Sequence, residues 1–161
     1  MADENYRAQI VWTRRDASFL KSRYSREHEL RFGDGLVVPA SAAPASLPPG
    51  IVNTRASVDP EQALVAAVSS CHMLFALAFF SKAGFIVERY EDNAVGLMGK
   101  NERGRYFIES ITLSPDIVFS GDKRPTAEDI AAIHHQSHDH CYIANSVRAD
   151  VAIAAVAPKF V

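Results

Sequence analysis

Residues 59–84, DPEQALVAAVSSCHMLFALAFFSKAG, contain the strongest local structural signal in the chain. Asp59 is a favourable helix N-cap, Pro60 suits the first helical position, and Gln62 completes a capping box. Gly84 is the residue type that commonly follows a helix end. The residues between these ends are apolar on almost every side. The pattern predicts a long helix that lies in the middle of a protein or of an oligomer.

The uncharged run within this helix, residues 63–81, is long enough to raise the alternative of a membrane span. It contains two serines and a histidine, and it follows a capped and charged start. We therefore interpret it as a buried core helix and expect no association with a membrane.

The bulk properties predict one soluble domain over residues 1–161. A net charge of -2 and a pI near 6.3 provide no basic surface for nucleic acid. The first residues, MADENYRAQIVW, carry charges where a signal peptide needs an apolar run, so we expect a cytoplasmic protein. In such a reducing compartment the two cysteines are reactive thiols or unrelated buried residues rather than a permanent disulfide.

Patterns of alternation and turn residues place strands on both sides of the long helix. Before it we expect a strand at residues 7–13, a polar loop at 14–26, a hairpin at 27–38 and an irregular connector at 39–58. After it we expect one or two strands at 85–100, a turn at 101–104, a strand at 105–113 that continues past Pro115 to 119, and a last strand at 147–153. The order of elements predicts an α+β fold, with sheets packed against a helical layer.

A second helix is predicted after Thr126, which forms a capping box with Asp129. One face of this helix repeats at helical spacing and must point inward. Its members are Ile130, Ile133, His134, Ser137, His138 and Cys141.

Cys71, in the middle of the long helix, is the main candidate for chemistry. A single cysteine in an apolar helix is often an inert small side chain. Its neighbours Ser69, Ser70 and His72, however, form a polar patch for which the helix has no structural need. Cys141 lies on another inward face, 70 residues away. Two such thiols could act as an attacking and a resolving pair in the reduction of a peroxide.

An attacking thiol must be a thiolate, so it needs a cation nearby, and an arginine held by a carboxylate supplies one. Glu61 is such a carboxylate, but it is also explained as a favourable charge at a helix N-terminus. It precedes Cys71 by ten residues, or about 15 Å of helix. If Glu61 serves the thiol, it must do so across a two-fold interface between two chains.

The motif DPEQALVAAVSSCHML, followed by His134, His138, Cys141 and the segment IANSV at residues 143–147, resembles the OsmC/Ohr family (osmotically inducible protein C and organic hydroperoxide resistance proteins). The CHML and IANS variants are most similar to the broad OsmC-like branch. The resemblance implies an intertwined homodimer with antiparallel sheets wrapped around the long central helix.

The resemblance also implies a thiol-dependent peroxidase for organic hydroperoxides, with Cys71 as the peroxidatic and Cys141 as the resolving cysteine. Glu61 and an arginine of the partner chain would complete each site. We favour Arg26 over Arg55 for this role. A dithiol, such as a lipoylated protein, would be the reductant, and no metal or organic cofactor is implied.

Two alternatives remain open at this stage. His134, His135, His138 and His140 cluster beside Cys141. Two of them, His134 and His138, share a helix face at i, i+4, the spacing of a helical metal site. A further possibility is a stress-response or small-molecule-binding protein that keeps the fold with little peroxidase activity. We expect organic hydroperoxides to be preferred, because Val68, Leu74, Phe75 and Phe79 would form an apolar wall around Cys71.

Overall fold

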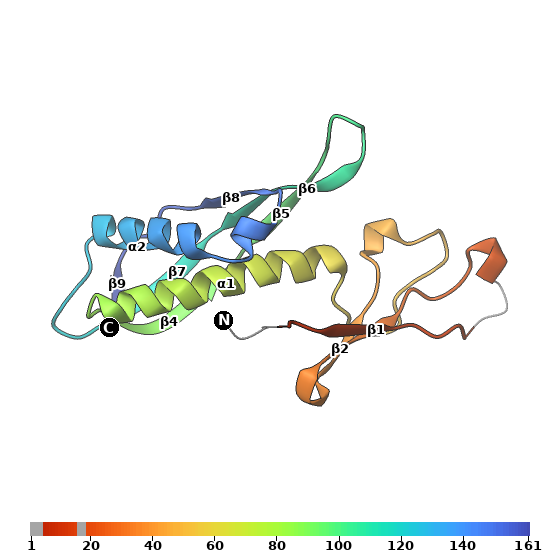
Figure 1. Ribbon diagram of the computed structural model, residues 1–161, viewed down its shortest axis with the longest axis horizontal. Helices are drawn as coiled ribbons and strands as arrows, with labels where there is room; N and C mark the ends of the chain where they lie inside the picture. The colour runs from red at the N-terminus through yellow and green to blue at the C-terminus, as the bar shows by residue number, and fades with distance from the viewer. Residues whose placement is uncertain (1–4, 16–18) are drawn as a thin grey trace. The chain divides into compact units, whose positions relative to one another are not determined.

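The computed structural model describes residues 5–15 and 19–161, and its parts fall into two compact units. The first unit is Met1–Ala63 and the second is Leu64–Val161. Helix α1, Pro60–Lys82, starts in the first unit and continues through the second (Figure 1). The two helices and the strands around them form an α+β fold, as predicted.

The first unit contains one antiparallel sheet in the order β1-β2-β3. Its strands are Ala8–Val11, His28–Phe32 and Val37–Ala40, so the predicted strand and hairpin are confirmed. The irregular connector begins later than predicted, because Pro39 and Ala40 extend β3 along the sheet edge, where proline is tolerated. Short 3-10 turns, Phe19–Lys21 and Pro44–Ser46, interrupt the two expected loops; residues 16–18 of the first loop lie outside the described part of the chain.

Both predicted ends of α1 are confirmed. Asp59 accepts a hydrogen bond from the Gln62 amide at 2.7 Å, and the Gln62 side chain accepts one from the Asp59 amide at 3.3 Å. Gly84 has a φ of +81°, and the Phe85 amide donates to the Phe80 carbonyl at 3.0 Å. The turn at Gly84 satisfies the last carbonyls of the helix, and it needs the left-handed conformation that glycine adopts at little cost.

The second unit contains two three-stranded sheets, with orders β4-β7-β9 and β5-β6-β8. The first holds Ile86–Asp92, Pro115–Ser120 and Lys159–Phe160; the second holds Val95–Lys100, Tyr106–Leu113 and Asp150–Ile153. The β4–β7 and β5–β6 pairs are antiparallel, whereas β6–β8 and β7–β9 are parallel. The parallel pairs bring the last part of the chain back onto strands formed earlier.

Two strand predictions were wrong in extent. The strand predicted to pass through Pro115 is broken at Ser114, whose amide donates to Asp92 at 2.6 Å, and β7 then joins the other sheet. Pro115 becomes the first residue of a strand, a position that does not require its missing amide proton. The last predicted strand starts at Asp150 rather than at residue 147, after a 3-10 turn, and β9 was not predicted.

Helix α2, Ala127–His140, has the predicted capping box. The Thr126 hydroxyl accepts from the Asp129 amide at 3.1 Å, and Asp129 accepts from the Thr126 amide at 2.9 Å. The predicted inward face is buried at five of its six positions, with His138 partly exposed. Cys141 caps the C-terminal end of the helix.

In the single chain one face of α1 is fully buried, and its other faces are partly or fully exposed. Its fully buried residues are spaced by four, namely Val68, His72, Ala76 and Phe80. Leu74, predicted to lie in the wall around Cys71, is 61% exposed in the single chain. Within the described residues α1 is the one helix with the length and composition of a membrane span, and 22% of its most apolar window is buried in the structure.

Two apolar clusters flank the buried stripe of α1. One joins Phe80 and Ala76 to residues of β7 and α2, and the other joins Val68 to Ile111 and Leu113 of β6. Between them α1 and α2 lie side by side (Figure 1), linked by a hydrogen bond of 2.9 Å between His72 Nε2 and His134 Nδ1.

This histidine pair is neutral at physiological pH. Burial lowers the pKa of His72 to about 4, with a smaller contribution from the charge of His138. Burial also lowers the pKa of His134 to about 4, with a smaller contribution from His72. Both values lie well below the ordinary histidine pKa of 6.5, so the rings pair as neutral donor and acceptor in the core.

The depressed pKa values predict a loss of stability in mild acid. Between pH 6.5 and about 4 the unfolded chain binds protons that the folded pair does not, so the free energy of unfolding falls as the pH is lowered. At ~1.4 kcal/mol per pKa unit, each histidine contributes on the order of 3 kcal/mol over this range. Urea unfolding at pH 7 and at pH 4.5 measures the difference.

His134→Gln should remove about half of this pH dependence, because only one titrating ring of the pair remains. His135→Gln is the matched control, since the His135 side chain is 81% exposed on the same helix. An equal change in the pH dependence of both variants would contradict the assignment to the buried pair.

Candidate active site

The structure brings the two predicted thiols together. Cys71 is partly buried in the middle of α1, whereas Cys141 is fully buried at the end of α2. The Cys71 thiol lies close enough to Cys141 to raise the pKa of the Cys141 thiol, and both cysteines are reduced. Residues 70 positions apart in the sequence are therefore neighbours, held by the packing of the two helices.

The surroundings of Cys141 favour its protonated form. Burial, together with the neighbouring Cys71 thiol, raises the pKa of the Cys141 thiol to about 11. The Ala144 amide donates to Cys141 Sγ at 3.4 Å and offsets part of this effect. On the other side, Sγ lies 4.0 Å from the Val68 carbonyl oxygen of α1. Cys141 is thus a thiol rather than a thiolate at neutral pH.

An aromatic cluster lies beside the cysteines. The Phe75 ring, one turn after Cys71 on α1, is 5.2 Å from the ring of Tyr142 in an edge-to-face arrangement. Phe79 follows one turn later, 6.1 Å from Phe75 and 5.4 Å from His140. Both phenylalanines were predicted for the apolar wall, and His140 was predicted in the histidine cluster beside Cys141, whereas Tyr142 was not predicted. The position of Tyr142 directly after Cys141 was the signal available for it.

Glu61, Arg26 and Arg55 belong to the first unit. Glu61 Oε2 is buried and has no hydrogen-bond partner within residues 5–15 and 19–161. The Arg26 guanidinium donates to the Tyr24 carbonyl at 2.7 Å and lies 3.5 Å from the centre of the Tyr24 ring. Arg55 donates to the His28 carbonyl at 3.4 Å. Glu61 remains ten residues before Cys71 on the same helix, about 15 Å away along its axis.

The histidines near Cys141 do not assemble as a metal site. In the described part of the chain, no three His, Cys, Asp or Glu side chains converge in an arrangement that could hold a metal ion. His134 points to His72, whereas His135 pairs with Asp139 at 3.7 Å on the exposed side of α2. His134, one of the two histidines whose spacing suggested a metal site, therefore packs against His72 of α1 instead.

Comparison with known proteins agrees with this geometry. The model of the OsmC-like protein family matches residues 53–155. A solved OsmC-like protein of unknown function from Vibrio cholerae is 41% identical, with a TM-score of 0.90 over 95% of this chain and 99% of that chain. A comparison with curated proteins finds no match.

Two organic hydroperoxide resistance proteins share the fold at lower identity. The protein from Elizabethkingia anophelis is 16% identical, with a TM-score of 0.64 over 99% of both chains. OhrB of Bacillus subtilis is 17% identical, with a TM-score of 0.56 over 97% of this chain and 98% of that chain. Because the family model spans most of the chain and the Vibrio cholerae relative matches nearly all of it, this protein belongs to the OsmC-like family.

Proposed function

We propose that the protein is a thiol-dependent peroxidase that reduces organic hydroperoxides to alcohols. The observation that carries the proposal is the contact between the Cys71 and Cys141 thiols. Two structures with the same fold are organic hydroperoxide resistance proteins, which supports the choice of substrate class. Thiols in contact can pass from dithiol to disulfide with little movement of the helices that carry them.

The proposed reaction has three balanced steps. The Cys71 thiolate attacks one oxygen of the hydroperoxide, the O–O bond breaks, and the departing alkoxide takes a proton to become an alcohol. Cys71 is then a sulfenic acid, and the Cys141 sulfur displaces its hydroxyl group as water to form a disulfide. A dithiol reductant, such as a lipoylated protein of the cytoplasm, restores both thiols and becomes a disulfide itself.

The burial of the two cysteines supports this division of roles. Cys141 is inaccessible to solvent and its raised pKa keeps it protonated, so it is a poor first nucleophile. Cys71 is the more accessible of the two, and its side of α1 carries Phe75 and Phe79. An apolar hydroperoxide gains burial against these rings, whereas hydrogen peroxide gains nothing from them.

We further propose that each site is completed in a homodimer. The buried Glu61 Oε2, without a partner in the described chain, is a suitable carboxylate to hold an arginine. About 15 Å of helix separates Glu61 from Cys71 of its own chain. The face of α1 that contains Ser70, Leu74 and Ala78 is exposed in the single chain. An isologous pair of such helices would cover this face and bring the partner's Glu61, with Arg26 or Arg55, to Cys71.

Substitution of the cysteines tests the chemistry. Cys71→Ser should abolish turnover of cumene hydroperoxide, because serine cannot form the sulfenic acid. Cys141→Ser should give one fast turnover and then stall at the sulfenic acid or its overoxidised forms. A dithiol-coupled peroxidase assay and intact-protein mass spectrometry measure both outcomes.

Ser81→Ala is the matched control, because Ser81 is exposed near the C-terminal end of α1, ten residues from Cys71, and it should retain activity. In wild type, one equivalent of cumene hydroperoxide should produce a Cys71–Cys141 linked peptide with a mass lower by two hydrogens. Full activity of Cys71→Ser would eliminate the mechanism.

Mixed dimers test the shared site. Cys71→Ser and Glu61→Gln proteins should each be inactive alone. After unfolding together and refolding, half of the dimers are mixed and each contains one intact site, so about a quarter of wild-type activity should return. The same assay with cumene hydroperoxide measures the recovery. If Glu61 served the thiol of its own chain, the mixture would remain inactive.

A further inference from the structure

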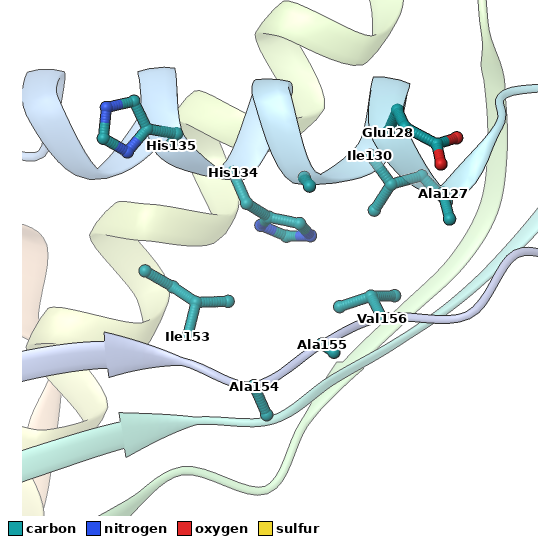
Figure 2. A pocket seen from close by; sticks show the side chains of 10 residues that line it. Ala127, Glu128, Ile130, His134, His135, Ile153, Ala154, Ala155 and Val156 are labelled. Atoms are coloured by element: carbon teal, nitrogen blue, oxygen red, sulfur yellow. The ribbon is translucent and has the colours of Figure 1, made fainter.

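A pocket apart from the cysteines lies between α2 and the end of β8 with the segment that follows it, entirely within the second unit. Its volume is about 460 Å³, within the range that small-molecule sites occupy. Ala127 and Ile130 of α2 lie on one side and residues 153–156 on the other (Figure 2). Ala131 of α2 also lines the pocket. Neither cysteine is among its lining residues, so the pocket is separate from the thiol site.

His134 places a single buried polar group in this apolar pocket. Its side chain extends from α2 into the space facing Ile153 and Val156 (Figure 2), and the residue is only 4% exposed. Nδ1 is bonded to His72. The other ring nitrogen, Nε2, is buried and has no hydrogen-bond partner anywhere in the described residues. A buried polar atom without a partner is unfavourable, and a bound ligand would relieve it.

The chemistry of the pair determines which ligand fits. If His134 donates through Nδ1, its Nε2 is an acceptor; if His72 donates through Nε2, the Nε2 of His134 is a donor. A hydroxyl group can donate or accept and therefore suits both arrangements. The ring is neutral at physiological pH, and Glu128 at the rim disfavours an anionic ligand. Alanine, isoleucine and valine side chains supply most of the remaining wall.

We propose that this pocket binds a neutral, largely apolar alcohol or phenol, whose hydroxyl group forms a hydrogen bond with His134 Nε2. The hydrocarbon part of the ligand would fill the space between Ala131 and residues 153–156. The alcohol product of the proposed peroxidase belongs to the same chemical class, but the site does not depend on the thiols for its geometry or its chemistry.

Titration of reduced protein with 2-naphthol, followed by NMR of the ¹⁵N-labelled chain, tests the proposal. Saturable shifts should concentrate at residues 127–135 and 153–156. The isosteric probe 2-methylnaphthalene lacks the hydroxyl group and should bind about fivefold or more weakly, as expected for the loss of one hydrogen bond. The titration should be unchanged in Cys71→Ser, which separates this site from the fate of the peroxidase proposal.

Two alanine variants form a matched pair. Ala131→Phe fills the pocket and should weaken 2-naphthol binding at least about tenfold, because the added ring occupies the volume of the probe. Ala132→Phe adds the same ring at the next position of α2, which does not line the pocket, and should leave binding unchanged. Equal binding of the two probes, equal effects of the two variants, or no saturable shifts up to the solubility of 2-naphthol would each overturn the proposal.

Discussion

The packing of α2 antiparallel to α1 is the constraint on which the rest of the structure depends. His134 meets His72 on α1, and Cys141, seven residues later, meets Cys71 and the carbonyl of Val68. Both contacts are made by the same inward face of α2, so both depend on the same register of α2 against α1. A shift of α2 by one turn would separate the rings and the thiols together. The buried hydrogen bond between neutral histidines therefore also maintains the geometry of the cysteine pair.

Burial shifts the pKa values of the two histidines and of Cys141 in opposite directions. Burial keeps the histidines neutral by lowering their pKa values, and it keeps Cys141 protonated by raising its pKa. In each case the charged form is disfavoured because the surroundings are apolar. A reaction that needs a thiolate must therefore begin at Cys71, and a nearby cation would stabilise that thiolate. In the described contacts, Arg26 and Arg55 donate to the backbone carbonyls of Tyr24 and His28 instead. This is the physical reason for proposing that a second chain completes the site.

α2 also connects the thiol site with the pocket lined by His134. The C-terminal end of the helix holds Cys141, whereas its first half, with Ala127 and Ala131, forms a wall of the pocket. His134 lies between them; its Nδ1 is bonded to His72, and its Nε2 has no partner in the described residues. The proposed peroxidase reaction uses the two cysteines, but it leaves the unpaired nitrogen of His134 unexplained. The proposed alcohol site gives that nitrogen a partner.

Signals that act over a few residues were sufficient to predict much of this structure. The capping boxes at Asp59 and Thr126, the glycine at 84 and the inward face of α2 depend on neighbours in the chain, and each was confirmed. The sequence also singled out Cys71 and Cys141 from their residue types and helical positions. Their sequence motif further indicated the family that the comparisons then established.

Tertiary packing alone decided the remaining features. Ser114 breaks a continuous strand pattern because its amide bonds to Asp92, 22 residues away, and β8 and β9 find parallel partners far along the chain. The pairing of His72 with His134 and the exposed face of α1 depend equally on distant contacts. The sequence by itself determined the elements, their ends and the reactive residue types, because these follow from local hydrogen bonds and periodicity. Only the tertiary structure decided which sheets formed, which histidines paired and where the pocket lined by His134 lies, because such contacts join residues that no local pattern relates.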